Sequence, residues 1–126
     1  MLERVLIVGI GGFVGANTRF LLGAWLAERL GASFPWATFV INVTGSLAIG
    51  FLLTFVTERV EVDPRWRLLF VTGFLGAYTT FSTFSLDTAL LYERGELGLA
   101  ALYVVVSVAL SIGGLFAGLA LVRHFS

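Results

Sequence analysis

Residues 73–85 read Gly73-Phe74-Leu75-Gly76-Ala77-Tyr78-Thr79-Thr80-Phe81-Ser82-Thr83-Phe84-Ser85, and they lie inside a long apolar segment. From position 79 onward every residue of this stretch carries a hydroxyl or a phenyl ring, and none is aliphatic. Serine and threonine compete for backbone hydrogen bonds and can bend helices, and glycines at 73 and 76 weaken the turn before them. The stretch predicts either a helix broken within the membrane or a continuous kinked helix whose hydroxyls bond to their own turns.

The composition of the whole chain indicates whether it resides in water or in a membrane. Of 126 residues, 58% are hydrophobic and 13% are charged, and the mean hydropathy is +0.96. Soluble domains are about 45–50% apolar and about 25% charged. A soluble chain of this size could not hide so much apolar surface, so we expect it to reside in lipid.

Four apolar segments are long enough to cross a bilayer, because a helical span needs about 20 residues. They cover approximately residues 5–27, 35–57, 66–92 and 97–122. The connections between them are short and carry charges and turn formers. The sequence therefore predicts an all-α integral membrane protein with four transmembrane helices, formed by a single domain over residues 1–126.

Several classes of function are excluded by the charge balance, the lack of cysteine and the single histidine. The formal net charge is zero, with eight arginines and no lysine among the basic residues, so nothing indicates a nucleic-acid partner. There is no cysteine, and His124 alone cannot form a metal site. No histidine or carboxylate lies at useful spacing from the many hydroxyls, so we expect no enzyme.

The arginines are divided unequally between the two ends of a four-span bundle. The end that holds both termini would carry Arg4, Arg59, Arg65, Arg67 and Arg123, and the opposite end Arg29 and Arg94. Because basic loops stay in the cytoplasm, a single orientation would have both termini inside.

Small residues recur at four-residue or eight-residue spacing in the first, second and fourth spans. Such faces let helix backbones approach closely in lipid, which favours a compact bundle or an oligomer. The residues are Gly11, Gly15, Gly23, Ser46, Gly50, Gly114 and Gly118.

Polar and aromatic residues inside the spans are the candidate functional groups, because polar side chains in lipid tend to face a cavity or a partner. Phe81 and Phe84 share a helix face, and their positive ring edges could contact a small anion. The alternative is that both rings serve ordinary packing.

Two further polar sets lie on other spans. Thr38 and Asn42 share a face of the second span, where the asparagine amide could donate to an anion or join two helices. A hydroxyl ladder on the fourth span could line a pore or form interhelical hydrogen bonds; it consists of Tyr103, Ser107 and Ser111.

Arg19 and Asp87 are the only charges deep within the spans. They could lie near the bilayer edge, extend toward water, or pair with each other. An arginine in a vestibule would raise the local concentration of anions.

Three blocks of the sequence resemble the Fluc (CrcB) family of fluoride ion channels. They are residues 11–20, which contain Gly11-Gly12, Gly15-Ala16 and Arg19-Phe20, residues 38–46, and residues 73–85 with Thr-Thr-Phe-Ser-Thr-Phe intact. The third block is highly specific, and the resemblance covers the whole chain in order. Ala77 stands where the family usually has Gly, and Asp87 where it often has Glu.

The resemblance implies an antiparallel, dual-topology homodimer with two pores in the cell inner membrane, which exports cytoplasmic fluoride passively. It implies that Phe81 and Phe84 contact the ion and that Asn42 donates a hydrogen bond to it. It also implies a structural Na⁺ at the dimer centre, held by the main-chain carbonyls of Gly76 and Thr79. Arg19 would attract anions to the vestibule, and the polar track would consist of Ser82, Thr83, Thr38, Tyr103, Ser107 and Ser111.

Two other functions compete with a channel. A small four-helix proton-coupled exporter would need a titratable carboxylate deep in the bundle, and Asp87 follows the third-span motif rather than lying within it. A non-conducting scaffold would explain the small-residue faces but not the cluster from Thr79 to Ser85.

Overall fold

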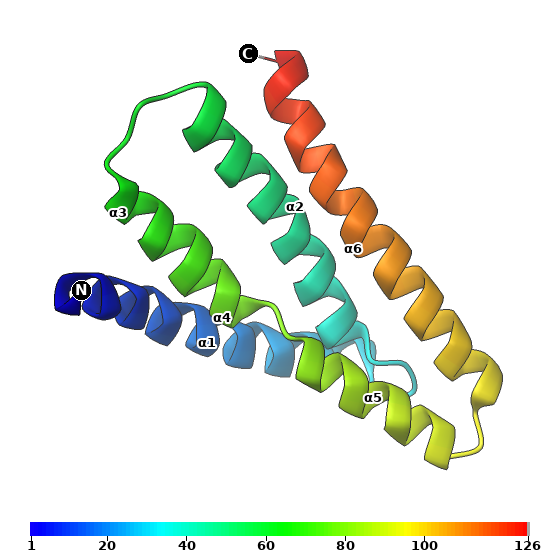
Figure 1. Cartoon of the computed structure of the whole chain (residues 1–126). Coiled ribbons are helices and arrows are strands. Elements are labelled where there is room, and N and C mark those ends of the chain that lie inside the picture. Colours follow the sequence, from blue (N-terminus) through cyan, green and yellow to red (C-terminus); the bar gives the residue numbers. More distant parts are fainter. Residues whose placement is uncertain (126) are drawn as a thin grey trace.

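The computed structural model describes residues 1–125, which are helical almost throughout (Figure 1). Within this part of the chain, four stretches are long and apolar enough to cross a membrane: Leu2–Leu30, Trp36–Glu58, Pro64–Glu93 and Leu97–Phe125. The prediction of an all-α fold with four long apolar helices is confirmed. The elements in chain order are α1 (Leu2–Leu30), α2 (Trp36–Glu58), α3 (Pro64–Arg67), the π-helix η1 (Leu68–Leu75), α4 (Gly76–Tyr78), α5 (Phe81–Glu93) and α6 (Leu97–Phe125).

Turn-forming residues end the helices. Gly31 and Gly95 have positive φ angles of 84° and 80°, which glycine adopts without steric cost. Asp63 caps α3 by accepting a hydrogen bond from the Arg65 N–H at 3.0 Å, and Pro64 occupies the first helical turn. Both termini and the 59–63 connection lie toward one end of the bundle, and the other two connections lie toward the opposite end (Figure 1).

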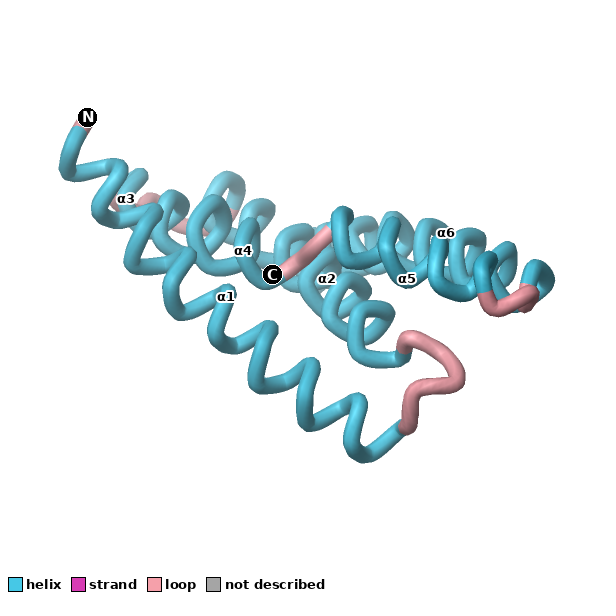
Figure 2. The backbone as a smooth tube through the Cα atoms, turned by 90° about the horizontal axis from the view of Figure 1, so that it is seen from below, coloured by secondary structure: helices cyan, strands magenta, loops and turns pink. Residues whose placement is uncertain are grey.

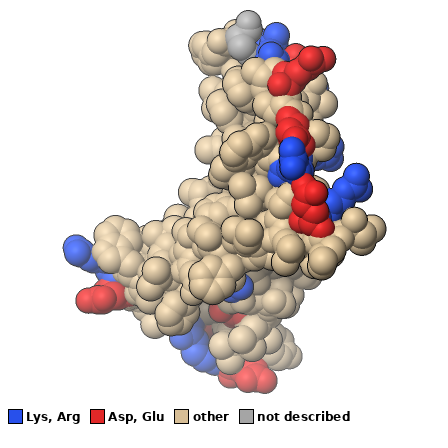
Figure 3. Space-filling model, turned by 90° about the vertical axis from the view of Figure 1, so that its left-hand side faces the viewer, with Lys and Arg blue, Asp and Glu red and all other residues tan. Residues whose placement is uncertain are grey.

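Charged side chains gather in groups near the extremities of the molecule, and most of the surface between them is uncharged (Figure 3). This uncharged band is what the hydrocarbon core of a bilayer requires. The exposed side chains on it are large and apolar; Phe13 on α1, for example, is 73% exposed. In a membrane such side chains face lipid or another protein chain.

Glycines on α1 allow close packing against the third helix. A Cβ atom at Gly11 would collide with the carbonyl oxygen of Leu69, and one at Gly15 with the carbonyl oxygen of Phe74. The small-residue face predicted on the first span is therefore a helix-packing face. Toward its C-terminal end α1 diverges from α5 and α6 (Figure 2).

The helices α2 and α6 form a second close pair. A Cβ atom at Gly50 would collide with the carbonyl oxygen of Leu115, and one at Gly118 with that of Leu47. Few side chains in the single chain are fully enclosed. One buried cluster comprises Ile41, Leu75 and Tyr78, and the other comprises Phe84, Leu91, Ala100 and Tyr103.

The π-helix η1 is a feature that the sequence analysis did not predict. Its wider turns cover Leu68–Leu75, immediately before the hydroxyl-rich stretch. It coincides with the closest approach of α1, because the backbone atoms that Gly11 and Gly15 contact belong to Leu69 and Phe74. Segments of π-helix are rare and occur often at functional sites.

Replacing Gly15 by alanine tests the close packing of α1. The added methyl group would overlap the Phe74 carbonyl, so Gly15→Ala is expected to lower the free energy of unfolding by about 1–3 kcal/mol. Thermal unfolding in detergent would measure the change. Gly9→Ala is the matched control on the same helix, because a Cβ at Gly9 meets nothing within 4 Å. Equal stability of the two variants would contradict this account of the contact.

Candidate functional site

The third span is interrupted at Thr79 and Thr80, which we call the break. Thr79 has φ −81° and ψ 157°, and Thr80 has φ −151° and ψ 120°, so both residues are extended. Helix α4 ends at Tyr78 and α5 begins at Phe81. Of the two alternatives left open by the sequence, the broken helix is the one observed. Backbone groups freed by a break must find other partners, because lipid offers none.

Asn42 of α2 supplies the partner for the N–H of Thr80 and also bonds to its carbonyl. Its Oδ1 atom accepts a hydrogen bond from the Thr80 N–H at 2.8 Å, and its Nδ2 atom donates to the Thr80 carbonyl at 3.0 Å. In a continuous helix the Thr80 N–H would donate to the carbonyl of Gly76. Asn42 therefore replaces a helical hydrogen bond. These two bonds use only one of the two N–H groups of its amide.

Thr80 also caps the helix that follows it. Its Oγ1 atom accepts a hydrogen bond from the Thr83 N–H at 3.1 Å, as an N-cap residue does. The hydroxyls of Ser82 and Thr83 each lie 3.2 Å from the same Oγ1 atom. These two predicted pathway residues thus belong to the cap of α5. Thr80 was missed by the sequence analysis, although threonine is a preferred N-cap residue.

The break removes the helical donors of the carbonyls of residues 76–79, and two of these carbonyls belong to the predicted sodium site. Because the Thr80 N–H bonds to Asn42 and the Thr83 N–H bonds to Thr80 Oγ1, the carbonyls of Gly76 and Thr79 lose the donors of a regular helix. Rings of free carbonyl oxygens can replace the hydration shell of an alkali cation. The carbonyl oxygens of Gly76 and Thr79 are thus of a ligand type that an alkali cation accepts, and the sodium ion at these two residues stays a prediction.

Arg19 of α1 reaches the same region. Its Nε atom donates to the carbonyl of Ala77 at 3.1 Å. This carbonyl lies at the C-terminal end of α4, where the helix dipole favours a positive charge. Arg19 is half-buried, and no ion pair joins it to Asp87 within residues 1–125.

Phenyl rings and hydroxyls meet between α5 and α6 in a groove of about 260 Å³. We call it the phenyl groove; it is lined by Phe81, Phe84, Ser107, Val108, Ser111 and Ile112. The ring centroids of Phe81 and Phe84 are 5.6 Å apart, and Phe81 is 77% exposed whereas Phe84 is buried. The buried Ser107 hydroxyl has no hydrogen-bond partner within the described residues. Within residues 1–125, a hydroxyl without a hydrogen-bond partner and two phenyl rings therefore line this groove.

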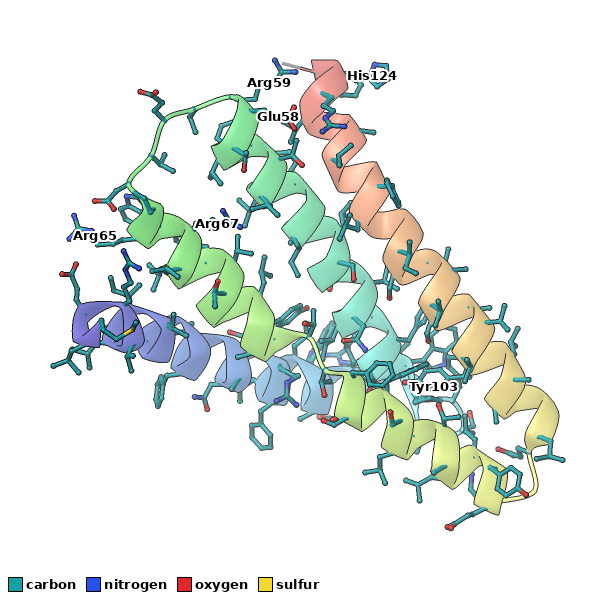
Figure 4. All side chains as sticks on the ribbon, in the orientation of Figure 1. Glu58, Arg59, Arg65, Arg67, Tyr103 and His124 are labelled. Atoms are coloured by element: carbon teal, nitrogen blue, oxygen red, sulfur yellow. The ribbon has the colours of Figure 1, made fainter. Side chains whose placement is uncertain are left out.

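Tyr103 lies behind the phenyl groove, where α2, α5 and α6 converge (Figure 4). Its ring is fully buried, with its centroid 5.1 Å from that of Phe84. Its hydroxyl donates to a carboxylate oxygen of Asp87 at 3.1 Å. The partner of Asp87 is thus a tyrosine hydroxyl, which no spacing along the sequence could indicate.

Thr38, on α2, lies in a separate hollow. This hollow has a volume of about 230 Å³, and Asp87 and Arg94 also line it. The predicted residues of the polar track therefore fall into three places in the single chain: the phenyl groove, the cap of α5 and the hollow at Thr38. The buried Tyr103 lies between the first and the last of these places.

These features define an integral membrane protein with an interrupted, polar helix in its interior, an arrangement typical of channels and transporters. The family model for "CrcB-like protein, Camphor Resistance (CrcB)" matches residues 6–119. The chain therefore belongs to the CrcB family, and the resemblance of its three sequence blocks to that family is confirmed.

Several curated relatives match the chain over nearly its full length. It is 54% identical over 121 residues to fluoride-specific ion channel FluC 2 of Nitrobacter hamburgensis, covering 96% of this chain and 98% of that protein. It is 47% identical over 122 residues to fluoride-specific ion channel FluC of Rhizobium meliloti, covering 97% and 98%. The FluC protein of Rhodospirillum centenum is 50% identical over 122 residues, with 97% of each chain covered.

Removal of the Asn42 amide tests whether this side chain holds the break. Asn42→Ala would leave the Thr80 N–H without a partner and would remove the Asn42 bond to the Thr80 carbonyl, at an expected cost of about 1–3 kcal/mol in the free energy of unfolding. Chemical denaturation in detergent would measure it. Asn17→Ala is the control, because the Asn17 amide bonds only to the Phe13 carbonyl one turn away on an exposed face. The interpretation fails if Asn42→Ala is no less stable than Asn17→Ala.

Proposed function

We propose that this chain forms a fluoride-specific ion channel. The observation that carries the proposal is its identity of 54% to fluoride-specific ion channel FluC 2 over 98% of that protein. Channel names recur among the other relatives, at 47% and 50% identity. The family is one of channels and not of enzymes. As a membrane protein with four spanning helices, it would let cytoplasmic fluoride leave the cell passively, down its electrochemical gradient.

The proposed path uses weak donors in place of a fixed charge. A small anion that leaves water needs hydrogen-bond donors and positive ring edges. Phe81 and Phe84 would supply the edges, and Ser107 and Ser111 would supply hydroxyls in the same groove. Asn42 would donate the amide N–H that Thr80 does not use. A strongly bound ion would not leave again, so weak contacts at several sites suit conduction.

The remaining predicted track residues would act beyond the phenyl groove. Tyr103 would donate its single hydroxyl proton to the ion after that proton leaves the carboxylate of Asp87, to which it is donated in the single chain. Thr38 would line the polar track at the hollow that Asp87 also lines. Ser82 and Thr83, at the cap of α5, would continue the track, and the charge of Arg19 would attract anions toward it.

We propose that two copies of this single four-helix domain form an antiparallel, dual-topology homodimer with two pores. Phe81 lies 77% exposed in one chain, so the aromatic wall of the path is incomplete without a neighbour. The carbonyls of Gly76 and Thr79 provide only part of a cation shell, and a second copy would double their number. A sodium ion at the dimer centre would bridge the two chains by binding these oxygens.

Substitution of the two phenylalanines tests the path. Phe81→Ile or Phe84→Ile removes a ring edge but keeps an apolar side chain, so fluoride release should slow about tenfold or more, equivalent to about 1.4 kcal/mol on the barrier. Release from fluoride-loaded liposomes, followed with a fluoride electrode, would measure it. Phe13→Ile, on an exposed face of α1, is the control. Unchanged release from both test variants would remove the rings from the path.

The same liposomes test selectivity and therefore the channel itself. Wild-type protein is expected to release fluoride quickly while chloride is retained. Release of neither ion, or of both at similar rates, would reject a fluoride-specific channel. A dependence of fluoride release on a proton gradient would instead support the four-helix proton-coupled exporter.

Removal of sodium tests the proposed cation. A ligand that binds only the assembled state stabilises it by mass action, so replacing Na⁺ with a bulky organic cation throughout purification should increase the monomer fraction. Size-exclusion chromatography with light scattering would measure this fraction, and returning Na⁺ should restore the dimer. An equal dimer fraction with and without Na⁺ would argue against the structural ion without rejecting the channel.

A further inference from the structure

Among the described residues 1–125, two arginine side chains differ from the others in having no partner. The side chains of Arg4 and Arg67 make no hydrogen bond, ion pair or ring contact within residues 1–125. The other arginine side chains are engaged: Arg19 with the Ala77 carbonyl, Arg29 with the Trp25 ring, Arg59 with the Arg123 carbonyl, Arg65 with Glu3 and Asp63, Arg94 with Glu96, and Arg123 with Glu58.

The two unpartnered arginines line the same hollow. It lies beside the first turns of α1 and the α3–η1 segment and has a volume of about 690 Å³. We call it the arginine hollow; it is lined by Met1, Glu3, Arg4, Asp63, Pro64, Arg65, Arg67, Leu68 and Thr72. Arg65 and Arg67 both extend from the start of the third span (Figure 4). The lining holds three arginines and two carboxylates, so its side chains carry an excess of positive charge.

Both acidic residues of this hollow already pair with a third arginine, Arg65. Arg65 donates to Glu3 at 2.9 Å and to Asp63 at 2.9 Å through its Nε atom. These hydrogen bonds hold the pKa of the Asp63 carboxyl below its usual value, so the carboxyl stays ionised and paired. Because both carboxylates bond to Arg65, the guanidinium groups of Arg4 and Arg67 keep their hydrogen-bond donors free for an anion within residues 1–125.

An apolar hollow adjoins the arginine hollow. It has a volume of about 330 Å³, is lined by Ile7, Ile10, Trp66 and Leu69, and shares Asp63 and Arg65 with its charged neighbour. Tryptophan is enriched at the level of lipid headgroups, and Trp66 is 53% exposed here. Charged groups cluster at this end of the molecule, beside the uncharged band (Figure 3). A ligand that fits both hollows must join an anionic group to an acyl chain.

We propose that Arg4 and Arg67 bind the phosphate of an anionic phospholipid, with an acyl chain along the apolar hollow beside Trp66. Guanidinium groups form paired hydrogen bonds with phosphate oxygens. Basic pockets between transmembrane helices recognise anionic headgroups in this way. The apolar hollow favours a lipid over free phosphate, which could use the arginines but not the adjoining groove.

Trp66 makes this site measurable by fluorescence. In a Trp25→Phe, Trp36→Phe background it is the only tryptophan. The full-length protein would be reconstituted in phosphatidylcholine vesicles containing a small fraction of either brominated phosphatidylglycerol or brominated phosphatidylcholine, because bromine quenches nearby tryptophan. Stronger quenching by the anionic lipid is expected, equivalent to an enrichment of about tenfold near Trp66.

Three arginine substitutions locate the source of this preference. The double variant Arg4→Gln, Arg67→Gln should lose it, whereas Arg59→Gln should keep it. Arg59→Gln is a fair control because Arg59 lies at the same end of the bundle but does not line the arginine hollow. The substitution removes one positive charge from that end. Circular dichroism and the dimer fraction would establish that each variant is folded.

Several results would overturn the proposal. Equal quenching by the two lipids in the parent protein would exclude a preference for the anionic headgroup. Loss of the preference in Arg59→Gln to the same extent as in the double variant would mean diffuse charge attraction. Displacement of the anionic lipid by millimolar inorganic phosphate, but not by chloride at equal ionic strength, would identify a free-phosphate site instead. The readout does not depend on fluoride conduction, so its failure leaves the proposed channel unaffected.

Discussion

A backbone group inside a membrane must find a hydrogen-bond partner in the protein, and the structure of this chain depends on meeting that requirement at one place. Two extended residues, Thr79 and Thr80, interrupt the third span where lipid offers no donor or acceptor. Asn42 replaces the missing helical bond of the Thr80 N–H, the Thr80 hydroxyl caps α5, and Arg19 donates to the Ala77 carbonyl. Two other helices therefore hold the break of the third.

The features that could be predicted from sequence are those set by local composition. Apolar runs of sufficient length predicted four long helices, and the hydroxyl-rich stretch after Gly73 and Gly76 indicated a break as one of two alternatives. The partners of Asn42, Arg19 and Asp87 could not be predicted, because each contact joins different helices and depends on their rotation and depth. The π-helix also escaped prediction, since no residue pattern in Leu68–Leu75 distinguishes it from an α-helix.

The candidate path combines groups that differ in how firmly they are held. Asn42 is fixed by two hydrogen bonds and Tyr103 by the Asp87 carboxylate, while the buried Ser107 hydroxyl has no partner in the described part of the chain. An unused donor in an apolar groove costs free energy in the empty protein. An anion that accepts a hydrogen bond from this hydroxyl would recover part of that free energy. The phenyl groove would therefore be more stable with an anion bound than when empty.

The π-helix has a consequence for how this protein can vary. Each residue of an α-helix advances the chain by about 100° around the axis, and a π-helical segment advances it by less. The segment Leu68–Leu75 thereby sets the angular phase with which the Gly76 and Thr79 carbonyls emerge. Insertion or deletion of one residue between the 59–63 connection and the break would turn these oxygens away from their present directions. The number of residues from Pro64 to Tyr78 is therefore constrained by the directions that the Gly76 and Thr79 carbonyls must take. The connections at the bundle ends carry no such constraint on their length.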